Sequence, residues 1–386
     1  MKILVVHNTY QHRGGEDTVV ESEIELLRTH GHSVEFYSRD NNDIKELSKL
    51  EILLQTFWSK RSANEIDSLI SEFAPDVIHI HNTFPLISPS IYWVAKKNNI
   101  AVIQTLHNYR LLCPQAMFLR KAKVCEECLG KIPWRGVIRG CYRDSLLQTG
   151  LLASMLVLHR VIGTWRNKVT RYIVLNKFCR DKFIKGGISG AQISIKPNFS
   201  LDINIKKRIR KGYLFVGRLS CEKGIDVLLA TIRTMDGVSL TIIGSGDEES
   251  KFIDVDGVTM LGHLSKKEIY EHMQSARALI IPSICYETFG MVAIEAFANN
   301  LPVIASRIGV LPDIVKDRVN GLLFNPGDSN DLLEKIRWSE NNSSEWLLMG
   351  NEARINFETY YTAEKNYLLL ISIYNDAIKE TVHDMH

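Results

Sequence analysis

The sequence lacks an apolar run long enough to cross a membrane. The best candidate, residues 146–158, is interrupted by Gln148 and Thr149 and is shorter than the roughly 20 residues that a transmembrane helix needs. The opening run, residues 1–7, reaches polar Asn8 at once, which is typical of a buried first strand and not of a signal peptide. We therefore expect a cytoplasmic protein.

Cysteine is scarce, and sequence repeats are missing. Seven cysteines in 386 residues, without an export signal, favour a reducing compartment over a disulfide framework. No internal repeat or low-complexity segment is present, which excludes a repeat architecture. The remaining composition is that of a globular chain, 45% hydrophobic and 24% charged, and its length suits two domains of ordinary size.

Charge of one sign is not in large excess overall, but it is unevenly distributed. The formal net charge is +3, while residues 1–200 carry 27 Lys and Arg against 18 Asp and Glu, and residues 201–386 carry 20 against 26. The basic excess is concentrated in residues 110–185, with 16 basic and 4 acidic side chains. We expect the two halves to meet different partners.

Strand-like and helix-like segments alternate along the chain, which predicts parallel α/β sheets. The buried strands expected in the first half are 3–6, 34–37, 77–80, 102–105 and 172–175. Those expected in the second half are 213–216, 240–243, 259–261, 278–281, 302–305 and 322–324. The main helices expected are 16–30, 225–234, 266–274, 291–299, 328–339 and 363–379. A polar stretch at 200–211 marks a hinge, so we expect one domain at 1–199 and a second at 200–362.

The first motif of the second half is GRLSCEKG at 217–224, directly after the strand expected at 213–216. Its glycines allow a sharp turn at the carboxyl end of a strand, which is the edge where open α/β sheets bind ligands. Arg218 and Lys223 can converge there on a diphosphate, the first as a planar fork and the second as a point charge. Two ordinary surface cations beside a tight turn are an equally open interpretation.

Two more turns in this half are glycine-rich. GSG at 244–246 follows the strand at 240–243, and GHL at 262–264 follows the strand at 259–261. Gly244 and Leu264 are therefore candidates for binding the same ligand, and amides near Leu264 can meet the edge of a nucleobase. Plain structural turns also explain both patterns.

The most specific motif is ETFGMVAIE at 287–295. Glu287 and Glu295 bracket a loop that opens a helix, and free amides with the helix dipole favour phosphate at such a point. Glu295 lies in an otherwise apolar helix face, where an unpaired carboxylate is costly. Ribose hydroxyls can supply the missing partner, and a local lysine or arginine is the alternative. The residues whose amides are candidates for this site are Thr288, Phe289, Gly290 and Met291.

These strings, together with PVIASRIGVLPDIV at 302–315, resemble the C-terminal half of the retaining family 4 glycosyltransferases (glycosyl transferases group 1). The resemblance extends over the whole chain, from HNT at 7–9 and the pair Gly14-Gly15 to the closing helix. It implies the α/β GT-B fold, in which two Rossmann-like, doubly wound domains face each other across a cleft. It also implies that the last helix, within 363–386, packs back on the N-terminal domain.

The resemblance also assigns roles to single residues. It implies Arg218 and Lys223 on the diphosphate of the donor, and Glu295 on its ribose. Glu287 and the backbone of residues 289–291 would hold the transferred sugar. Gly14 and Gly15 match the glycine loop that closes over the donor, and His107 matches the histidine that contacts the donor sugar. Without the family, His107 is interpreted as a loop histidine with a satisfied hydrogen bond.

The implied reaction is transfer of a sugar, with retention, from a nucleoside-diphosphate sugar to a glycan or lipid-linked acceptor. Arg218, Lys223 and helix-terminal amides would stabilise the leaving phosphate in place of a metal, so no cofactor is expected in catalysis. Since no carboxylate matches a nucleophile of the family, we favour front-face substitution, with Glu287 as a covalent nucleophile the alternative. By analogy, the acceptor belongs to bacterial O-antigen, capsule or exopolysaccharide assembly.

A separate cluster of cysteines lies in the basic part of the first half. Cys113, Cys125, Cys128 and Cys141 have the number and roughly the spacing of a structural zinc site. Four protein thiolates would leave no open position on the ion. Coincidental free thiols are the alternative.

Basic residues flank the apolar segment 146–158 on both sides. This arrangement suits docking on the anionic inner face of the cytoplasmic membrane, and a solvated charged face beside a buried helix explains it as well. The residues are Arg110, Arg120, Lys121, Lys123, Lys131, Arg135, Arg139, Arg143, Arg160, Arg166, Lys168 and Arg171.

Two other functions compete with glycosyl transfer. A nicotinamide-dependent oxidoreductase shares Rossmann domains, but residues 7–15 lack the compact GxGxxG spacing after the first strand. A non-catalytic module that binds sugar nucleotides is the other alternative, and the intact set of charged motif residues argues against it. A nucleic-acid partner is not expected.

Overall fold

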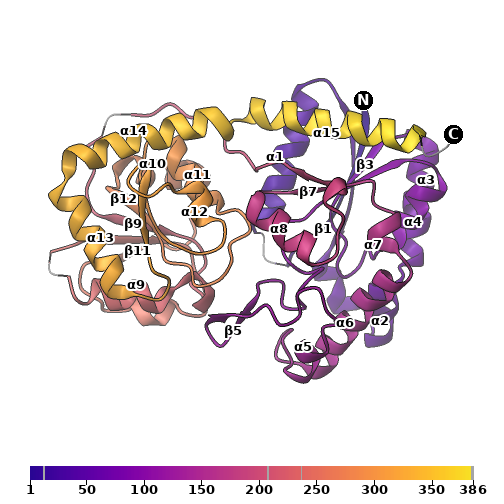
Figure 1. The fold of residues 1–386 in the computed structure, drawn as a ribbon, viewed down its shortest axis with the longest axis horizontal. Coiled ribbons are helices and arrows are strands. Elements are labelled where there is room, and N and C mark those ends of the chain that lie inside the picture. The colour runs from indigo at the N-terminus through magenta and orange to yellow at the C-terminus, as the bar shows by residue number, and fades with distance from the viewer. Residues whose placement is uncertain (12–13, 207, 236, 384–386) are drawn as a thin grey trace. The chain divides into compact units, whose positions relative to one another are not determined.

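The computed structural model describes the chain except residues 12–13, 207, 236 and 384–386. The last three belong to the predicted closing segment 363–386 and lie outside the described residues. The chain forms two compact units (Figure 1). Unit 1 contains Met1–Ala116, Glu126–Lys196 and Tyr367–His386, and unit 2 contains Met117–Cys125 and Pro197–Asn366.

Unit 1 is built on a six-stranded parallel sheet in the order β2-β1-β3-β4-β7-β8. Its strands are β1 (Lys2–Thr9), β2 (Ser33–Asp40), β3 (Val77–Asn82), β4 (Ala101–Thr105), β7 (Arg171–Val174) and β8 (Ile193–Ile195). Its helices are α1 (Gly15–Thr29), α2 (Lys49–Phe57), α3 (Lys60–Phe73), α4 (Ser90–Lys97), α5 (Trp134–Ile138), α6 (Leu146–Val161), α7 (Thr164–Asn167), α8 (Lys177–Lys185) and, from Tyr367 on, α15 (Ala363–His383).

One face of this sheet changes from apolar to polar along its strands. Successive side chains alternate between the two faces, so Val77, His79 and His81 of β3 share a face. Val77 lies in the hydrophobic core, while both histidines are buried nearer the carboxyl end of the strand. Polar side chains on this face therefore lie near the carboxyl ends of the strands, where such sheets bind ligands. The residues of α1 and α15 that pack on the apolar part are Val20, Ile24, Leu27, Leu370, Ile373, Tyr374 and Ala377.

Unit 2 contains a second six-stranded parallel sheet, in the order β11-β10-β9-β12-β13-β14. Its strands are β9 (Tyr213–Val216), β10 (Leu240–Ile243), β11 (Val258–Met260), β12 (Ala278–Ile281), β13 (Val303–Ser306) and β14 (Gly321–Phe324). Its helices are α9 (Ile225–Ile232), α10 (Lys266–Ser275), α11 (Met291–Ala298), α12 (Leu311–Ile314), α13 (Ser329–Asn341) and α14 (Ser343–Tyr360). A short antiparallel pair, β5 (Leu119–Arg120) and β6 (Lys123–Val124), completes the unit.

The strand order of unit 2 reverses between β9 and β12. In chain order the sheet is 3-2-1-4-5-6, the doubly wound arrangement in which ligands bind beyond the carboxyl ends of the strands at the reversal. The loops that follow β9 and β12 diverge from that point. They carry the motifs GRLSCEKG and ETFG, respectively.

The alternation of strands and helices predicted from the sequence is confirmed, with both large sheets fully parallel. The strands β9, β10 and β12 have the predicted bounds, and several others differ by one to three residues at an end. The sequence pattern did not predict α14, since Gly350 and Ala353 occupy two of its buried positions and do not stand out as apolar. None of the described helices combines the length and the apolar character that would let it span a bilayer.

Candidate functional site

Three turns lie side by side at the carboxyl edge of the sheet in unit 2. The amide of Gly217 donates to Ile243 O at 3.0 Å, and the amide of Leu219 donates to Ser245 O at 2.9 Å. The amide of Gly244 donates to Gly262 O at 2.7 Å. The glycine-rich segments found after β9, β10 and β11 are thus one hydrogen-bonded surface.

Glycine is required in these turns by the close approach of backbone segments. Gly244 has φ +129°, and a side chain there would collide with the carbonyl oxygen of Gly217. Gly224 has φ +74°, and its side chain would collide with the carbonyl oxygen of Pro282, which precedes the ETFG loop. Both glycines therefore have a structural role, and Gly224 fixes the first motif against the loop after β12.

An ion pair joins the two main motifs at the reversal point. Lys223 Nζ donates to Glu287 Oε1 at 2.6 Å, and Ser283 Oγ donates to the same oxygen at 2.7 Å. Burial opposes both charges, but each partner outweighs it, so the lysine pKa is raised and the glutamate pKa is lowered. Lys223 and Glu287 are therefore a charged pair at neutral pH, and Ser283 is a site residue that sequence motifs alone did not indicate.

Arg218 is placed at the same edge but is not held by the pair. Its side chain is 71% exposed, and its Nη2 donates to Glu222 Oε1 at 3.1 Å. Ser220 Oγ donates to that oxygen at 2.7 Å. The two cations of the motif therefore point to different carboxylates, and an exposed guanidinium can turn toward an anion at small cost.

Glu295 has the local lysine that the sequence left open as an alternative. Lys266 Nζ lies 3.7 Å from Glu295 Oε1, a long ion pair. Burial raises the pKa of Glu295, and Lys266 only partly offsets that effect. The carboxylate is thus incompletely satisfied, as a ligand-binding group on the first turns of α11 would be.

The other predicted residues of unit 2 surround these groups. Gly290, with φ +80°, caps the N-terminus of α11, and Phe289 is buried with its ring 6.0 Å from that of Tyr361. Thr288 and Met291 are partly exposed on either side. Leu264 is partly exposed next to His263, whose Nε2 lies 2.6 Å from Ser245 Oγ.

In unit 1, Asp17 anchors the glycine loop. Its carboxylate accepts hydrogen bonds from the amides of Gly14 at 2.8 Å and Tyr10 at 3.3 Å, and it pairs with His7 Nε2 at 2.8 Å. Gly15 is different from the glycines of unit 2, because a side chain there would meet nothing within 4 Å. Packing among the described residues therefore does not explain Gly15. An acidic residue at the start of a helix was the available signal for Asp17.

His107 is buried at the end of β4 and lines a small pocket within unit 1. Its Nε2 lies 2.8 Å from His81 Nδ1, and burial lowers the pKa of His107 to about 3, so the ring is neutral. His81 also lines this pocket, together with Arg110 and the apolar side chains of Leu111 and Met155. His107 thus has a hydrogen bond, as expected of a loop histidine, and it also borders a cavity.

The clustered cysteines occupy the segment between β4 and α6. Cys113 is buried, and the other three are partly exposed. A methyl group on Gly136 would lie 3.6 Å from Cys128 Sγ and 3.3 Å from Pro114 Cγ, and the amide of Cys141 donates to Gly136 O at 3.0 Å. Unit 1 therefore brings the segments of three of the four cysteines to one point.

Both halves of the chain match family models of glycosyltransferases. Residues 13–199 match the family model of Glycosyltransferase Family 4, and residues 201–356 match that of Glycosyl transferases group 1. The sulfoquinovosyl transferase SQD2 of Arabidopsis thaliana is 26% identical over 76% of this chain and 56% of its own length. An uncharacterized 42.6 kDa protein in the cps region of Klebsiella pneumoniae is 23% identical over 81% of this chain and 87% of its own. The chain spans about half the length of several curated relatives that it matches.

Solved structures share the fold over almost the full length. The lipopolysaccharide outer core galactosyltransferase WaaB superposes with a TM-score of 0.65 at 17% identity, covering 98% of this chain and 99% of that chain. The Anabaena protein HepE in complex with UDP-glucose superposes with a TM-score of 0.67 at 16% identity, covering 100% of both.

The glycine loop leads to a prediction about pH. Burial raises the pKa of Glu16 from 4.5 to about 7, and Tyr10 OH donates to its Oε2 at 2.9 Å. A carboxyl with a raised pKa contributes stability that is present below pH 4.5 and lost as the pH rises through 7. We expect Glu16→Gln to raise the free energy of unfolding relative to wild type at pH 8, by up to about 3 kcal/mol, and to have little effect at pH 4.5. Urea unfolding at both pH values measures this. Glu25→Gln, on the exposed side of the same helix, is the control, and an equal effect of Glu16→Gln at both pH values contradicts the prediction.

Proposed function

The chain belongs to the group 1, family 4-like glycosyltransferases and has the α/β GT-B fold, and we propose that it transfers a sugar, with retention, from a nucleoside-diphosphate sugar to a glycan or lipid-linked acceptor. The observation that carries the proposal is the Lys223–Glu287 pair at the strand reversal of unit 2. Parallel sheets bind nucleotides at that place. The UDP-glucose complex of HepE supports a nucleotide-sugar donor.

We propose a role for four charged residues of the motifs in unit 2. The diphosphate binds to Lys223 and to Arg218, whose exposed guanidinium moves from Glu222 to the phosphate. The incompletely paired Glu295 accepts from the ribose hydroxyls, and Glu287 and the amides at the start of α11 hold the sugar. Gly244 and Leu264 are proposed to contact the donor as well. For His107 and for the Gly14-Gly15 loop of unit 1 we propose the donor contacts that the family resemblance implies.

The chemistry follows from where negative charge develops. The bond between the anomeric carbon and the phosphate oxygen breaks, and the β-phosphate leaves as an anion stabilised by Lys223 and Arg218. In front-face substitution, the acceptor hydroxyl attacks from the side of the leaving group, and a leaving phosphate oxygen takes its proton. Glu287 is less suited to nucleophilic attack, because its Oε1 already accepts from both Lys223 and Ser283.

Removing the charged groups tests the donor site. We expect Lys223→Ala and Glu295→Ala to lower kcat/KM by about 30- to 1000-fold, since each removes a charge-assisted contact worth about 2–4 kcal/mol. Lys335→Ala is the control, because Lys335 forms an ion pair with Asp331 on α13. Circular dichroism confirms folding. Wild-type kinetics in either site variant would remove the assignment.

The cationic site also predicts that catalysis needs no divalent metal. Lys223 and Arg218 supply the positive charge that a metal gives to other enzymes of this kind of reaction. We expect the initial rate of sugar transfer in freshly added excess EDTA to match the untreated rate. A complete loss that magnesium restores would show that the charges of this site have another role.

The acceptor is proposed to enter the pocket of unit 1. Arg110 lines its edge and lies over the rings of Phe84 at 4.7 Å and Tyr142 at 5.5 Å, and its Nη1 is buried without a hydrogen-bond partner among the described residues. A cation beside the apolar wall of Leu111 and Met155 suits a phosphate linked to a lipid. The relative in a cps region and the likeness to WaaB support a place in bacterial O-antigen, capsule or exopolysaccharide assembly.

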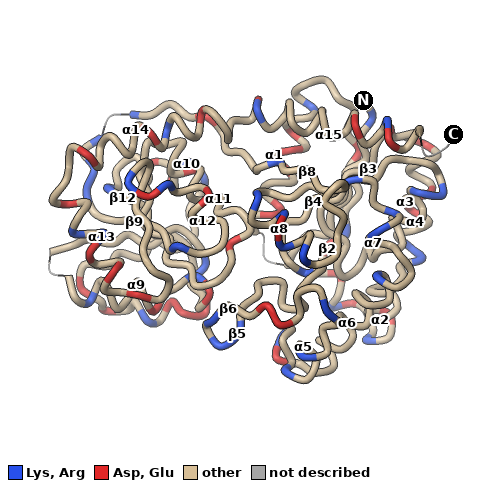
Figure 2. Tube along the Cα trace, viewed as in Figure 1, with Lys and Arg blue, Asp and Glu red and all other residues tan. Residues whose placement is uncertain are grey.

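A lipid-linked acceptor requires access to the membrane, and unit 1 offers a surface for it. The α6 helix packs against α2 and α5, and all three expose large apolar side chains. Figure 2 shows Lys and Arg along α5 and α6. We call the exposed apolar residues on and beside these helices the membrane surface. We propose that it docks on the anionic inner face of the cytoplasmic membrane. Its apolar members are Leu50, Leu54, Trp58, Ile132, Trp134, Ile138, Leu146, Leu147 and Val161.

Vesicle binding tests the membrane surface. We expect the protein to sediment with phosphatidylglycerol vesicles at low salt, to bind phosphatidylcholine vesicles weakly, and to lose binding about tenfold in Leu147→Glu. Leu147 is 81% exposed, so the change leaves the core intact. Leu347→Glu, at a 65% exposed leucine of unit 2, is the matched control. Equal sedimentation of all three proteins contradicts docking through this surface.

We also propose that Cys113, Cys125, Cys128 and Cys141 bind one structural zinc ion. The segments of three of them meet at Gly136 within unit 1, and Cys125 precedes Cys128 by the CxxC step, which lets two thiolates bind one ion with little strain.

Zinc content checks this proposal directly. Protein purified without chelator is expected to carry about one zinc per chain by elemental analysis, and Cys128→Ser is expected to lose it and to unfold at a lower temperature. Cys221→Ser changes an exposed thiol of unit 2 and keeps the zinc. A zinc-free wild-type protein would overturn the site.

A further inference from the structure

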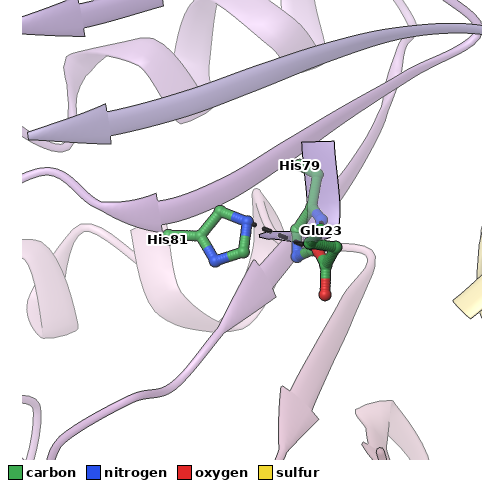
Figure 3. A group of neighbouring side chains, drawn as sticks. All are labelled: Glu23, His79 and His81. Atoms are coloured by element: carbon green, nitrogen blue, oxygen red, sulfur yellow. Dashed lines mark ion pairs between the residues drawn. The ribbon is translucent and has the colours of Figure 1, made fainter. Parts of the chain in front are cut away.

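A buried polar cluster lies at the carboxyl ends of the strands in unit 1. Glu23 of α1, His79 and His81 of β3, His107 after β4 and Lys196 after β8 are all within it, each at most 9% exposed. Figure 3 shows Glu23 beside the two histidines of β3. None of the motifs that led to the proposed function includes Glu23, His79, His81 or Lys196.

The charge of Glu23 is already balanced. Its Oε2 accepts from Lys196 Nζ at 2.7 Å, and its Oε1 lies 3.0 Å from His79 Nδ1 and 3.6 Å from His81 Nε2. Glu23, His79 and His81 offer three potential metal-ligand atoms within 4.8 Å of one another. A metal ion there would lie beside the ammonium of Lys196 with only one carboxylate for both cations, so the ion pair of Glu23 with Lys196 accounts for the buried carboxylate better.

The position of Glu23 determines which nitrogen of His81 carries the proton. Burial lowers the pKa of His81 and of His107, so each ring is neutral and has one N–H. His81 Nε2 lies 3.6 Å from Glu23 Oε1, beyond hydrogen-bond distance, and both atoms are buried without a hydrogen-bond partner among the described residues. At this distance the carboxylate repels a lone pair on Nε2 and attracts an N–H, so its charge favours the proton on Nε2 and leaves Nδ1 as an acceptor.

The tautomer of His81 determines which nitrogen of His107 carries the proton. His81 Nδ1 lies 2.8 Å from His107 Nε2, and since the first is an acceptor, the second must be the donor. His107 Nδ1 then carries a lone pair. No hydrogen bond to this Nδ1 is found among the described residues, and His107 lines the pocket, so this nitrogen is the one that a ligand in the pocket can use.

We propose that Glu23 and His81 are positioning residues that fix His107 in the Nε2–H tautomer, so that its Nδ1 accepts a hydrogen bond from a hydroxyl group of the substrate. The identity of the substrate as a sugar rests on the proposed function. As a hydrogen-bond acceptor, His107 Nδ1 favours a hydroxyl group of the substrate. It disfavours an ionised phosphate or carboxylate oxygen, because the lone pairs of the two atoms repel each other. This relay, from Glu23 through His81 to His107, thus gives the pocket of unit 1 a preference for hydroxyl groups.

The tautomer of His107 can be measured without any assay of activity. The two-bond proton–nitrogen spectrum of the full-length protein, labelled with ¹⁵N-histidine, distinguishes a protonated from an unprotonated ring nitrogen, and His107→Gln identifies the signals. We expect Nε2 to carry the proton in the wild-type protein at neutral pH. A wild-type signal with the proton on Nδ1 would overturn the proposal, whatever the variants do.

Variants of His81 test the relay. His81→Leu removes the acceptor, and we expect His107 to lose its single tautomer and kcat/KM to fall about 10- to 100-fold. His81→Asn can place an amide oxygen near the former Nδ1, so we expect it to restore the Nε2–H signal and most of kcat/KM. Failure of the asparagine to differ from the leucine would count against a positioning role.

His79→Leu is the matched control. His79 lies two residues away on the same face, is equally buried and also contacts Glu23, but no hydrogen bond joins it to His107 in the described structure. We expect its melting temperature to fall while the His107 tautomer stays fixed. A lost tautomer in His79→Leu would show a general effect of packing and overturn the relay. If the tautomer behaves as expected but His81→Leu retains full kcat/KM, the relay stands and the donor contact of His107 in the proposed function fails.

Discussion

The polar interior of unit 1 depends on the ion pair between Glu23 and Lys196. Both side chains are at most 3% exposed, so each would be strongly destabilising without the other; removing one partner of such a pair typically costs about 3–5 kcal/mol. The pair joins α1 to the end of β8, at opposite ends of the N-terminal part of the chain. The fixed carboxylate lies 3.0 Å from His79 Nδ1 and 3.6 Å from His81 Nε2, and the proposed tautomer of His107 depends on its charge.

Unit 2 also contains an ion pair at the ends of its strands, but this pair is less buried than that of unit 1. Lys223 and Glu287 also form a pair at the ends of parallel strands, but their side chains remain 27% and 15% exposed. A pair that touches solvent can exchange partners with a ligand, whereas a fully buried one cannot without leaving a charge unpaired. The Glu23–Lys196 pair therefore suits a structural role, whereas the Lys223–Glu287 pair suits the ligand binding that we propose for it.

Much of the fold followed from the sequence, because apolar strands alternating with amphipathic helices have few other arrangements. The site was harder to predict in full. Lys223 and Glu287 stand in recognisable motifs, but the bond between them depends on strand order, which periodicity does not give. Glu23 and Lys196 lie 173 residues apart, and each resembles an ordinary surface charge. His79 and His81 were the available signal, since two histidines with a spacing of two on a buried strand must share a face.

The chain passes between the units more than once, and this has a consequence for synthesis on the ribosome. Unit 1 takes its last part from Tyr367 onward, and Leu370 and Tyr374 of that part are fully buried in its core. The hydroxyl of Tyr374 also lies 2.7 Å from His79 Nδ1. A nascent chain that has completed all six strands of the first sheet still exposes an apolar face and lacks a partner for a buried histidine until unit 2 has been made. Most of unit 1 is thus translated before unit 2 but is completed after it, and chaperones would meet unit 1 in that open state.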